Sequence, residues 1–251
     1  MRLIIKQSLD KPLILPVNHQ HILQSIIYHN LKTDYGFSEQ LHDEGYLYGK
    51  RHYKLFTFSW LQGKYEYSVE EKKITFYDEV TLEVRSPDLR MIQVLTENIK
   101  KNGITYGENH VTDVKLILDD ESIEAEQLHI KMKTPVCVYS TKREDHFTTF
   151  YSPKDPEFFR LINENFYRKY YAYYGVYPEY PIEMIPVKVT NKDKKIVKYQ
   201  SCHICGWKGD YILKGKRKYL DFLYQTGIGC KNSQGFGMWT VYDEKKKEQY
   251  D

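Results

Sequence analysis

The sequence predicts an α+β protein made of two similar halves, and two observations support this prediction. Segments with strand character alternate with segments of helical periodicity along all 251 residues, and the order strand–helix–strand–strand–helix–strand occurs twice. A chain of this length suits one large domain or two small ones. The prediction is therefore a tandem ferredoxin-like fold, whose βαββαβ order RNA-recognition modules also use.

The first half is predicted to cover residues 1–120. Its strands are indicated by alternating apolar, β-branched or aromatic residues, and they are expected at 2–8, 54–61, 73–77, 80–85 and 111–118. The first helix follows the first strand, because Leu23, Ile27 and Leu31 recur at helical spacing. Asn18 is placed to cap this helix.

Two more helices are expected in the first half. A short one is predicted over residues 38–43, before Gly45. Another begins at Ser86-Pro87-Asp88, where a capping serine, a proline at the first helical position and an acid in the first turn follow one another. Gly103 ends this helix, because glycine readily adopts the left-handed conformation found after a last turn.

The second half is predicted to cover residues 121–251, after the acidic stretch 119–121. Its strands are expected at 127–139 with a break at Pro135, at 182–189, at 236–242, and in a hairpin-like pair of 196–202 with 207–213. Asp155-Pro156 opens a long helix that ends near Gly175, and a shorter helix is expected over 219–224. Pro186 favours an edge position for the strand that contains it.

The composition excludes several classes of protein. Hydrophobic residues make up 41% and charged residues 28% of the chain, which is typical of a folded protein and not of a disordered one. No apolar run approaches 18 residues, so no membrane helix is expected, and the N-terminus lacks the apolar core of a secretory signal. Four cysteines are too few for a disulfide scaffold, and a reducing cytoplasm is the expected location.

The net charge of +3 conceals a basic segment. Residues 188–219 contain ten Lys or Arg and two Asp, a local balance of +8, which leaves −5 for the rest of the chain. Such a segment indicates a polyanion-binding face, and interleaved aromatic residues such as Tyr199 and Trp207 suit stacking on bases. The alternative is a solvated lysine-rich hairpin.

A glycine-rich loop near the C-terminus is the second candidate binding feature. Residues 227–237 contain four glycines in eleven positions, with Lys231, Asn232 and Ser233 between them. Glycines allow a phosphate or a backbone to approach closely. The loop follows a helix and precedes a strand, the reverse of what a dinucleotide-binding or Walker loop requires. The alternative is a tight connection whose glycines are required by geometry.

These motifs together resemble a known family. Gly227-Ile-Gly-x5-Gly-Phe-Gly is similar to the C-terminal glycine-rich signature of the repeat-associated RAMP proteins of CRISPR systems. Residues 18–28, 41–42 and 54–59 are similar to the Cas six endoribonucleases, which cut CRISPR repeat RNA. The resemblance covers both ends of the chain.

The resemblance implies an endoribonuclease that processes precursor CRISPR RNA without a metal ion or another cofactor. It implies that the RNA 2′-hydroxyl attacks the adjacent phosphorus and leaves 5′-hydroxyl and 2′,3′-cyclic phosphate ends. The matching catalytic positions are Tyr28, His42 and Lys54. Histidine suits proton transfer, lysine suits charge stabilisation and tyrosine can donate a hydrogen bond. The segment between His42 and Lys54 is longer than usual for the family, so Lys50 or Arg51 is an alternative to Lys54.

The expected partner is the repeat of precursor CRISPR RNA. The residues expected to contact it lie in the glycine-rich loop and the basic segment, and they are Lys231, Asn232, Ser233, Lys214, Lys216 and Arg217. Subunits of a CRISPR interference complex are further expected partners, and a monomer or a homodimer is expected. The rival hypothesis is a non-catalytic RAMP subunit that binds the repeat, which need not carry Tyr28, His42 and Lys54.

The cysteines do not predict a metal site. Cys202 and Cys205 form a CxxC motif around His203, whereas Cys137 and Cys230 are distant in sequence. A structural zinc normally takes four ligands from two paired motifs, so a single CxxC is a weak signal. No metal is therefore expected, and a zinc ion on Cys202 and Cys205 is the alternative.

Overall fold

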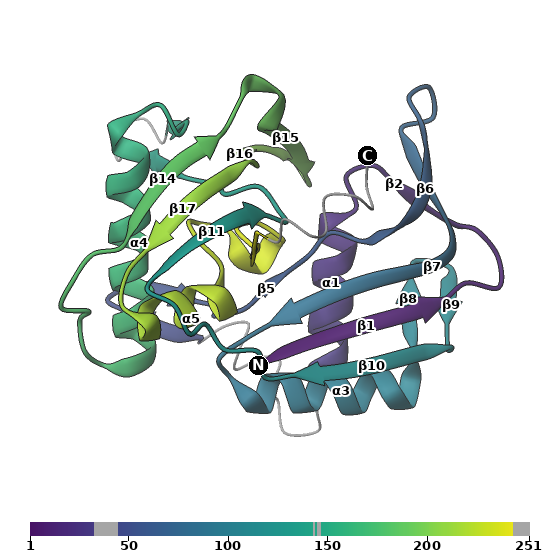
Figure 1. Cartoon of the computed structure of the whole chain (residues 1–251). Coiled ribbons are helices and arrows are strands. Elements are labelled where there is room, and N and C mark those ends of the chain that lie inside the picture. The colour runs from purple at the N-terminus through teal and green to yellow at the C-terminus, as the bar shows by residue number, and fades with distance from the viewer. Residues whose placement is uncertain (33–44, 143, 145–146, 243–251) are drawn as a thin grey trace.

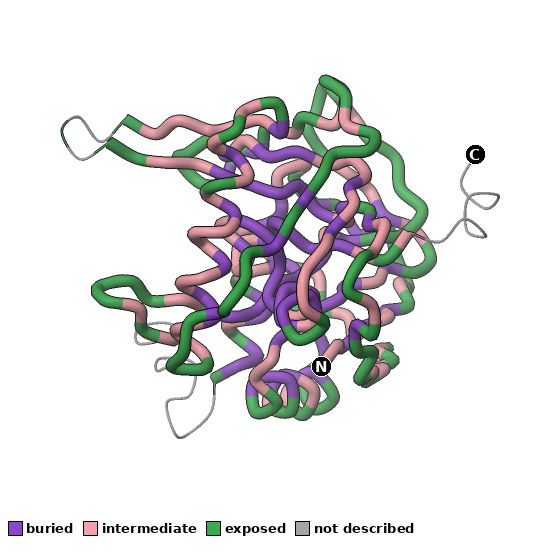
Figure 2. Tube along the Cα trace, turned by 60° about the vertical axis from the view of Figure 1, so that its left-hand side comes forward, coloured by how far each residue is buried: buried purple, intermediate pink, exposed green. Residues whose placement is uncertain are grey.

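The computed structural model describes residues 1–32, 45–142, 144 and 147–242. The chain forms two halves, each with a main antiparallel sheet and two covering helices (Figure 1). The predicted α+β class with tandem ferredoxin-like halves is confirmed. Buried residues concentrate in the interior of both halves, and the hairpin tips are exposed (Figure 2). None of the described helices is both long enough and apolar enough to cross a membrane.

The first sheet is organised around one long strand. Its members are β1 (Arg2–Ser8), β2 (Leu13–Pro16), β5 (Thr57–Phe58), β6 (Gln62–Ser68), β7 (Lys73–Arg85) and β10 (Val114–Asp119). β7 pairs antiparallel with β1, β2, β5 and β6, and β1 also pairs with β10. The helices α1 (Gln20–Asn30) and α3 (Leu89–Asn102) cover one face of this sheet.

The core of the first half follows from residue spacing. Alternate residues of β1, including Leu3 and Ile5, point inward and are fully buried. They meet Leu23 of α1 and Leu95 of α3, which occupy the inward faces of their helices. The predicted strand 2–8 is confirmed at both ends because its alternation is unbroken.

The second sheet has the same architecture. Its strands are β11 (Gln127–Met132), β14 (Glu183–Lys188), β17 (Asp210–Lys214) and β18 (Trp239–Val241), in the antiparallel order β14-β17-β11-β18. The helices of this half are α4 (Pro156–Tyr174) and α5 (Arg217–Thr226). α4 ends at Gly175, whose φ of 71° is left-handed as predicted. β14 lies at the sheet edge, as predicted from its proline.

Four hairpins and two short 3-10 helices complete the described fold. The hairpins are β3 (Tyr46–Tyr48) with β4 (Arg51–Tyr53), β8 (Ile104–Tyr106) with β9 (Asn109–Val111), β12 (Tyr139–Thr141) with β13 (Thr148–Phe150), and β15 (Lys194–Tyr199) with β16 (Cys202–Trp207). The 3-10 helices are η2 (Asn191–Asp193) and η3 (Asn232–Gln234).

Some of the predicted strands differ from the structure. The two strands predicted at 73–77 and 80–85 are one strand, because a bulge at Asp78, with φ of 63°, lets the chain continue. The pairing of 196–202 with 207–213 was wrong: β15 pairs with β16, and β17 belongs to the main sheet. The helix predicted at 38–43 lies outside the described residues.

Two predicted helix caps have other roles. α1 begins after His19, and Asn18 instead accepts a hydrogen bond from the backbone N–H of Lys198 at 3.1 Å. The cap of α3 is Asp88, whose side chain accepts from Met91 N–H at 3.1 Å. The predicted caps Asn18 and Ser86 were thus both wrong, because tertiary contacts compete for these polar side chains.

A buried ion cluster joins the two halves. Arg85 of β7 is 1% exposed and lies 2.5 Å from the carboxylate of Glu83, while Lys133 from the second half bonds the other oxygen of that carboxylate. Arg85 also donates to Trp239 O at 2.8 Å, and its guanidinium lies 3.7 Å from the centre of the Tyr224 ring. Burial alone would raise the pKa of Glu83, but Arg85 and Lys133 lower it to about 2.

We predict that Glu83→Gln lowers the free energy of unfolding at pH 7 by about 3 kcal/mol, because it leaves a buried arginine without its anion. The folded-state pKa of Glu83 lies below its ordinary value of 4.5. Its contribution is therefore complete above pH 4.5 and is lost as the pH falls towards 2. Chemical denaturation should show that the difference in unfolding free energy between wild type and Glu83→Gln is smaller at pH 3 than at pH 7.

The matched control is Glu79→Gln on the same strand. Glu79 is exposed and lies 3.8 Å from Lys6, so its loss should cost less than about 1 kcal/mol. An unfolding free energy of Glu83→Gln equal to that of the control at pH 7 would contradict this account.

Candidate active site

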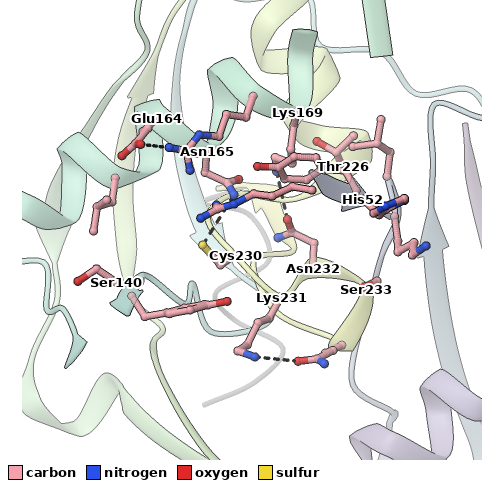
Figure 3. A pocket seen from close by; sticks show the side chains of 18 of the residues that line it. His52, Ser140, Glu164, Asn165, Lys169, Thr226, Cys230, Lys231, Asn232 and Ser233 are labelled. Carbon is pink, nitrogen blue, oxygen red and sulfur yellow. Dashed lines mark hydrogen bonds and ion pairs between the residues drawn. The ribbon is translucent and has the colours of Figure 1, made fainter. Parts of the chain in front are cut away.

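A cavity of about 730 Å³ lies where the two halves meet (Figure 3). Its walls come from residues 51–55 of the first half and from residues 139–141, α4 and the glycine-rich loop of the second. The lining residues include six cations and one carboxylate, namely Arg51, Lys54, Arg160, Arg168, Lys169 and Lys231, with Glu164. The cavity is therefore electropositive and suits a polyanion.

The glycine-rich loop keeps a shape that only glycine permits. Gly235 and Gly237 have φ of 83° and 76°. A Cβ on Gly237 would lie 2.0 Å from Ile228 O, and one on Gly235 would lie 2.8 Å from a ring carbon of Phe58. The backbone geometry therefore requires these glycines, which was the alternative interpretation of the loop. The loop also forms one wall of the cavity.

Asn232 holds this loop together. Its side chain is buried and donates to Ile228 O at 3.1 Å and to Phe236 O at 3.0 Å, and its Oδ1 accepts from Lys169 Nζ at 3.1 Å. Lys169 Nζ also donates to Gly227 O at 2.6 Å. The hydrogen-bonding groups of Asn232 are thus used within the protein, which favours a structural role for a residue predicted to contact RNA.

Burial lowers the pKa of Lys169 to about 7. Lys169 is therefore more easily deprotonated than an ordinary lysine when the cavity holds no anion. A phosphate in the cavity would favour the charged form, because an opposite charge nearby stabilises it. Lys169 was not predicted from the sequence, since α4 is recognised by its apolar residues.

α4 also carries two arginines to the cavity. Arg160 Nη1 lies 3.3 Å from Glu164, and Arg168 pairs with the same carboxylate. These residues are spaced by four, so they share one face of the helix. The sequence contains the spacing Arg-x3-Glu-x3-Arg. The two arginines could have been predicted from this spacing.

Lys54 lines the cavity, as do Arg51 and His52. Gly45 lies against Lys54, since a Cβ on Gly45 would meet Lys54 Nζ at 3.1 Å. Lys50 is exposed in the turn between β3 and β4 and is not among the lining residues. Lys54 is thus better placed than Lys50, and Arg51 remains an alternative.

Tyr28 lies on α1, beside the loop wall. Its ring packs edge-to-face on Phe56 with centroids 5.9 Å apart, and burial, then Tyr199, raises the pKa of its hydroxyl well above the ordinary value. Gln24, one turn earlier on α1, donates to Ser233 O at 2.6 Å and so holds the helix against the loop. Tyr28 itself is not among the lining residues.

The remaining predicted residues do not all line the cavity. Lys231 and Ser233 line the cavity, and His42 lies outside the described residues. Lys214, Lys216 and Arg217 are ion-paired with Glu183, Glu179 and Glu124 respectively, and none of the three lines the cavity. The last two lie at the start of α5, whereas Thr226 at its end lines the cavity, and a ten-residue helix is about 15 Å long.

The two cysteines of the CxxC motif do not converge. Cys202 and Cys205 lie three residues apart on β16, and successive strand residues point to opposite faces, so their side chains point to opposite sides. Within the described residues, no group of three or more His, Cys, Asp or Glu side chains is arranged to hold a metal ion.

Two known protein families match this chain, one over each half. The family described as CRISPR-associated protein Cas6, N-terminal, matches residues 14–121, and the family described as CRISPR associated protein Cas6, C-terminal, matches residues 118–241. This chain belongs to the Cas6 family. The predicted resemblance is thereby confirmed, and the two Cas6 matches together cover both sides of the cavity.

Two Cas6 relatives match over nearly their whole length. CRISPR-associated endoribonuclease Cas6 1 of Methanocaldococcus jannaschii is 26% identical over 258 residues, which cover 99% of this chain and 95% of the relative. CRISPR-associated endoribonuclease Cas6 of Pyrococcus furiosus is 26% identical over 274 residues, covering 98% of this chain and 90% of the relative.

Solved structures share the fold. A structure described as CRISPR associated protein Cas6 has a TM-score of 0.74 at 24% identity, with 97% of this chain and 99% of that chain covered. A structure described as an RAMP protein binding different RNA substrates has a TM-score of 0.79 at 22% identity, with 97% and 100% covered.

We predict that Asn232→Ala lowers the free energy of unfolding by about 3 kcal/mol in the absence of RNA. Each buried polar partner left unsatisfied costs about 1–3 kcal/mol, and this variant removes three hydrogen bonds. Chemical denaturation measures the effect. Ser233→Ala is the control and should change stability by less than about 1 kcal/mol, because α1 contacts Ser233 through its backbone carbonyl. Equal stability of Asn232→Ala and wild type would exclude the structural role.

Proposed function

We propose that this protein is a metal-independent endoribonuclease that cleaves CRISPR repeat sequences in precursor CRISPR RNA. The observation that carries the proposal is an electropositive cavity lined by Lys54 and the glycine-rich loop in a chain of the Cas6 family. Both relatives compared above are named as CRISPR-associated endoribonucleases. We also propose that residues 1–120 and 121–251 are the two domains, which enclose the RNA between them.

The proposed reaction needs no cofactor because RNA carries its own nucleophile. One group removes the 2′ proton, a second stabilises the negatively charged phosphorane, and a third protonates the 5′-oxygen that leaves. Lys54 is suited to the second task, since it is a cation among the residues that line the cavity. The products are a 2′,3′-cyclic phosphate and a 5′-hydroxyl.

His42 is proposed to transfer the proton as general acid or base. An imidazole can both accept and donate a proton near neutral pH, so it suits either role.

Tyr28 is proposed to orient the reacting groups by donating a hydrogen bond. Burial, then Tyr199, raises the pKa of its hydroxyl, so at neutral pH Tyr28 favours the protonated form that donates a hydrogen bond. Its helix is fastened to the loop wall through Gln24.

The glycine-rich loop is proposed to hold the repeat through Lys231 and Ser233, with Asn232 maintaining the loop. The Lys231 ammonium lies 5.2 Å from the centre of the Tyr139 ring, on the cavity side of the loop. Lys214, Lys216 and Arg217 would contact only RNA that extends beyond the cavity. Association with interference-complex subunits and homodimer formation are further proposals that rest on the family alone.

The rival function is a non-catalytic subunit that binds the repeat. We predict that purified protein cleaves repeat RNA in excess EDTA and that a single 2′-deoxy substitution before the cut site abolishes cleavage, because it removes the nucleophile. Gel analysis of labelled RNA measures both. Cleavage that requires Mg²⁺, or that continues with the 2′-deoxy substrate, would refute the mechanism. Tight binding with no cleavage would favour the rival.

Variants test the catalytic assignment. We predict that His42→Ala lowers the single-turnover cleavage rate by about 10²–10⁴-fold, the usual cost of losing a general acid or base, while RNA affinity is largely kept. Lys54→Ala should lower the rate by about 10²–10³-fold, the cost of losing one group that stabilises developing charge.

Lys50→Ala is the matched control for Lys54, since Lys50 belongs to the adjoining hairpin but lies outside the cavity lining. Its rate should stay within about threefold of wild type. Unchanged cleavage by His42→Ala would remove His42 from the mechanism, and a larger loss for Lys50→Ala than for Lys54→Ala would reverse the lysine assignment.

A further inference from the structure

Three tyrosines, one from the first half and two from the second, form a partly exposed cluster where β3 packs against the end of α4. The rings of Tyr171 and Tyr177 lie 4.5 Å apart, and Tyr48 packs edge-on against both, at 5.6 and 6.3 Å. The hydroxyls of Tyr48 and Tyr177 are hydrogen-bonded at 3.0 Å. Tyr177 is 54% exposed and its neighbour Val176 is 59% exposed, so packing of the core does not account for this cluster.

Two of the three tyrosines are neighbours of residues that line the cavity. Tyr48 is the cross-strand partner of Arg51 in the β3–β4 hairpin, and such partners share one face with Cβ atoms about 5 Å apart. Tyr171 follows Arg168 by three residues on α4, which places both on one helical face about 5–6 Å apart. Arg51 and Arg168 line the cavity. An RNA strand in the cavity can therefore continue over the tyrosines.

We infer that Tyr48, Tyr171 and Tyr177 bind the bases of single-stranded RNA that adjoins the segment held in the cavity. This inference rests on the proposed function. Aromatic rings beside a groove lined by cations are the combination that binds single strands, since the cations follow the phosphates and the rings stack on bases of any sequence. Glu179, two residues after Tyr177, is paired with Lys216 at 2.9 Å, so its charge is compensated.

The cluster is also held ready for stacking. The hydrogen bond between Tyr48 and Tyr177 restrains two rings that come from distant parts of the chain. Rings that are restrained before binding lose less conformational entropy when a base stacks on them. Stacking would extend recognition past the cut site without requiring a particular sequence there.

The test uses repeat RNA with a 2′-deoxy nucleotide before the cut site, so that binding is measured without cleavage. One RNA is a short core of the repeat centred on the cut site, and two others carry six additional repeat nucleotides on its 5′ or its 3′ side. Tyr177→Ala should raise the Kd about tenfold for one of the two extended RNAs, in the range measured for base stacking on an aromatic side chain. It should leave the Kd for the unextended RNA within twofold of wild type.

Two control variants separate stacking from other effects. Tyr177→Phe keeps the ring and loses only the hydrogen bond to Tyr48, so its Kd on the affected RNA should lie much closer to that of wild type than to that of Tyr177→Ala. Tyr67→Ala removes a 52% exposed tyrosine of β6 and should not distinguish the three RNAs in the same way. Thermal unfolding confirms that the variants fold.

Equal Kd values of wild type and Tyr177→Ala on both extended RNAs would overturn the inference, as would an equal loss on the unextended RNA. A change from dimer to monomer in Tyr177→Ala, measured by light scattering, would assign the cluster to self-association instead. Failure of the wild type to bind or cleave any repeat RNA would instead refute the proposed function.

Discussion

The cavity depends on the hydrogen bonds that the buried side chain of Asn232 makes. A loop with four glycines in eleven positions has high conformational entropy and does not hold one shape by backbone preference. Three hydrogen bonds from Asn232 fix it, one of them to Lys169 from α4. The loop, α4 and the end of α5 are therefore held together, and Lys231 and Ser233 are presented on the cavity side.

The first half reaches the same place through separate contacts. Arg85 and Glu83 bring the end of β7 against Lys133 and Trp239 of the second half. Gln24 ties α1 to the loop. Because these contacts come from different segments, the cavity forms only when both halves are folded and joined. The position of Lys54 opposite the loop is thus a consequence of the tertiary structure and not of any local motif.

The sequence predicted correctly those elements whose position is set by neighbouring residues in the chain. β1 follows from unbroken alternation of apolar residues, and the end of α4 follows from a glycine that can adopt positive φ at Gly175. The prediction missed β6, whose residues are almost all exposed, so that no buried face marks this strand. The cap predicted at Asn18 failed because a contact with residue 198, far along the chain, takes the side chain.

The site was predictable only in part, for the same reason. Motifs indicated Lys54 and Lys231, and the structure places both in one cavity. Charge density indicated residues 188–219, yet the cavity cations come mainly from α4 and β4, where charges are spread among apolar residues. The lowered pKa of Lys169 depends on burial, which no linear pattern shows.

The central claim is that the scissile phosphate lies between Lys54 and the glycine-rich loop. Photo-crosslinking tests it directly, with 4-thiouridine next to the cut site of a 2′-deoxy repeat RNA and mass spectrometry of the attached peptides. The account predicts crosslinks in residues 51–55 and 227–237. Crosslinks confined to the basic segment 188–219, with none in the cavity walls, would contradict it.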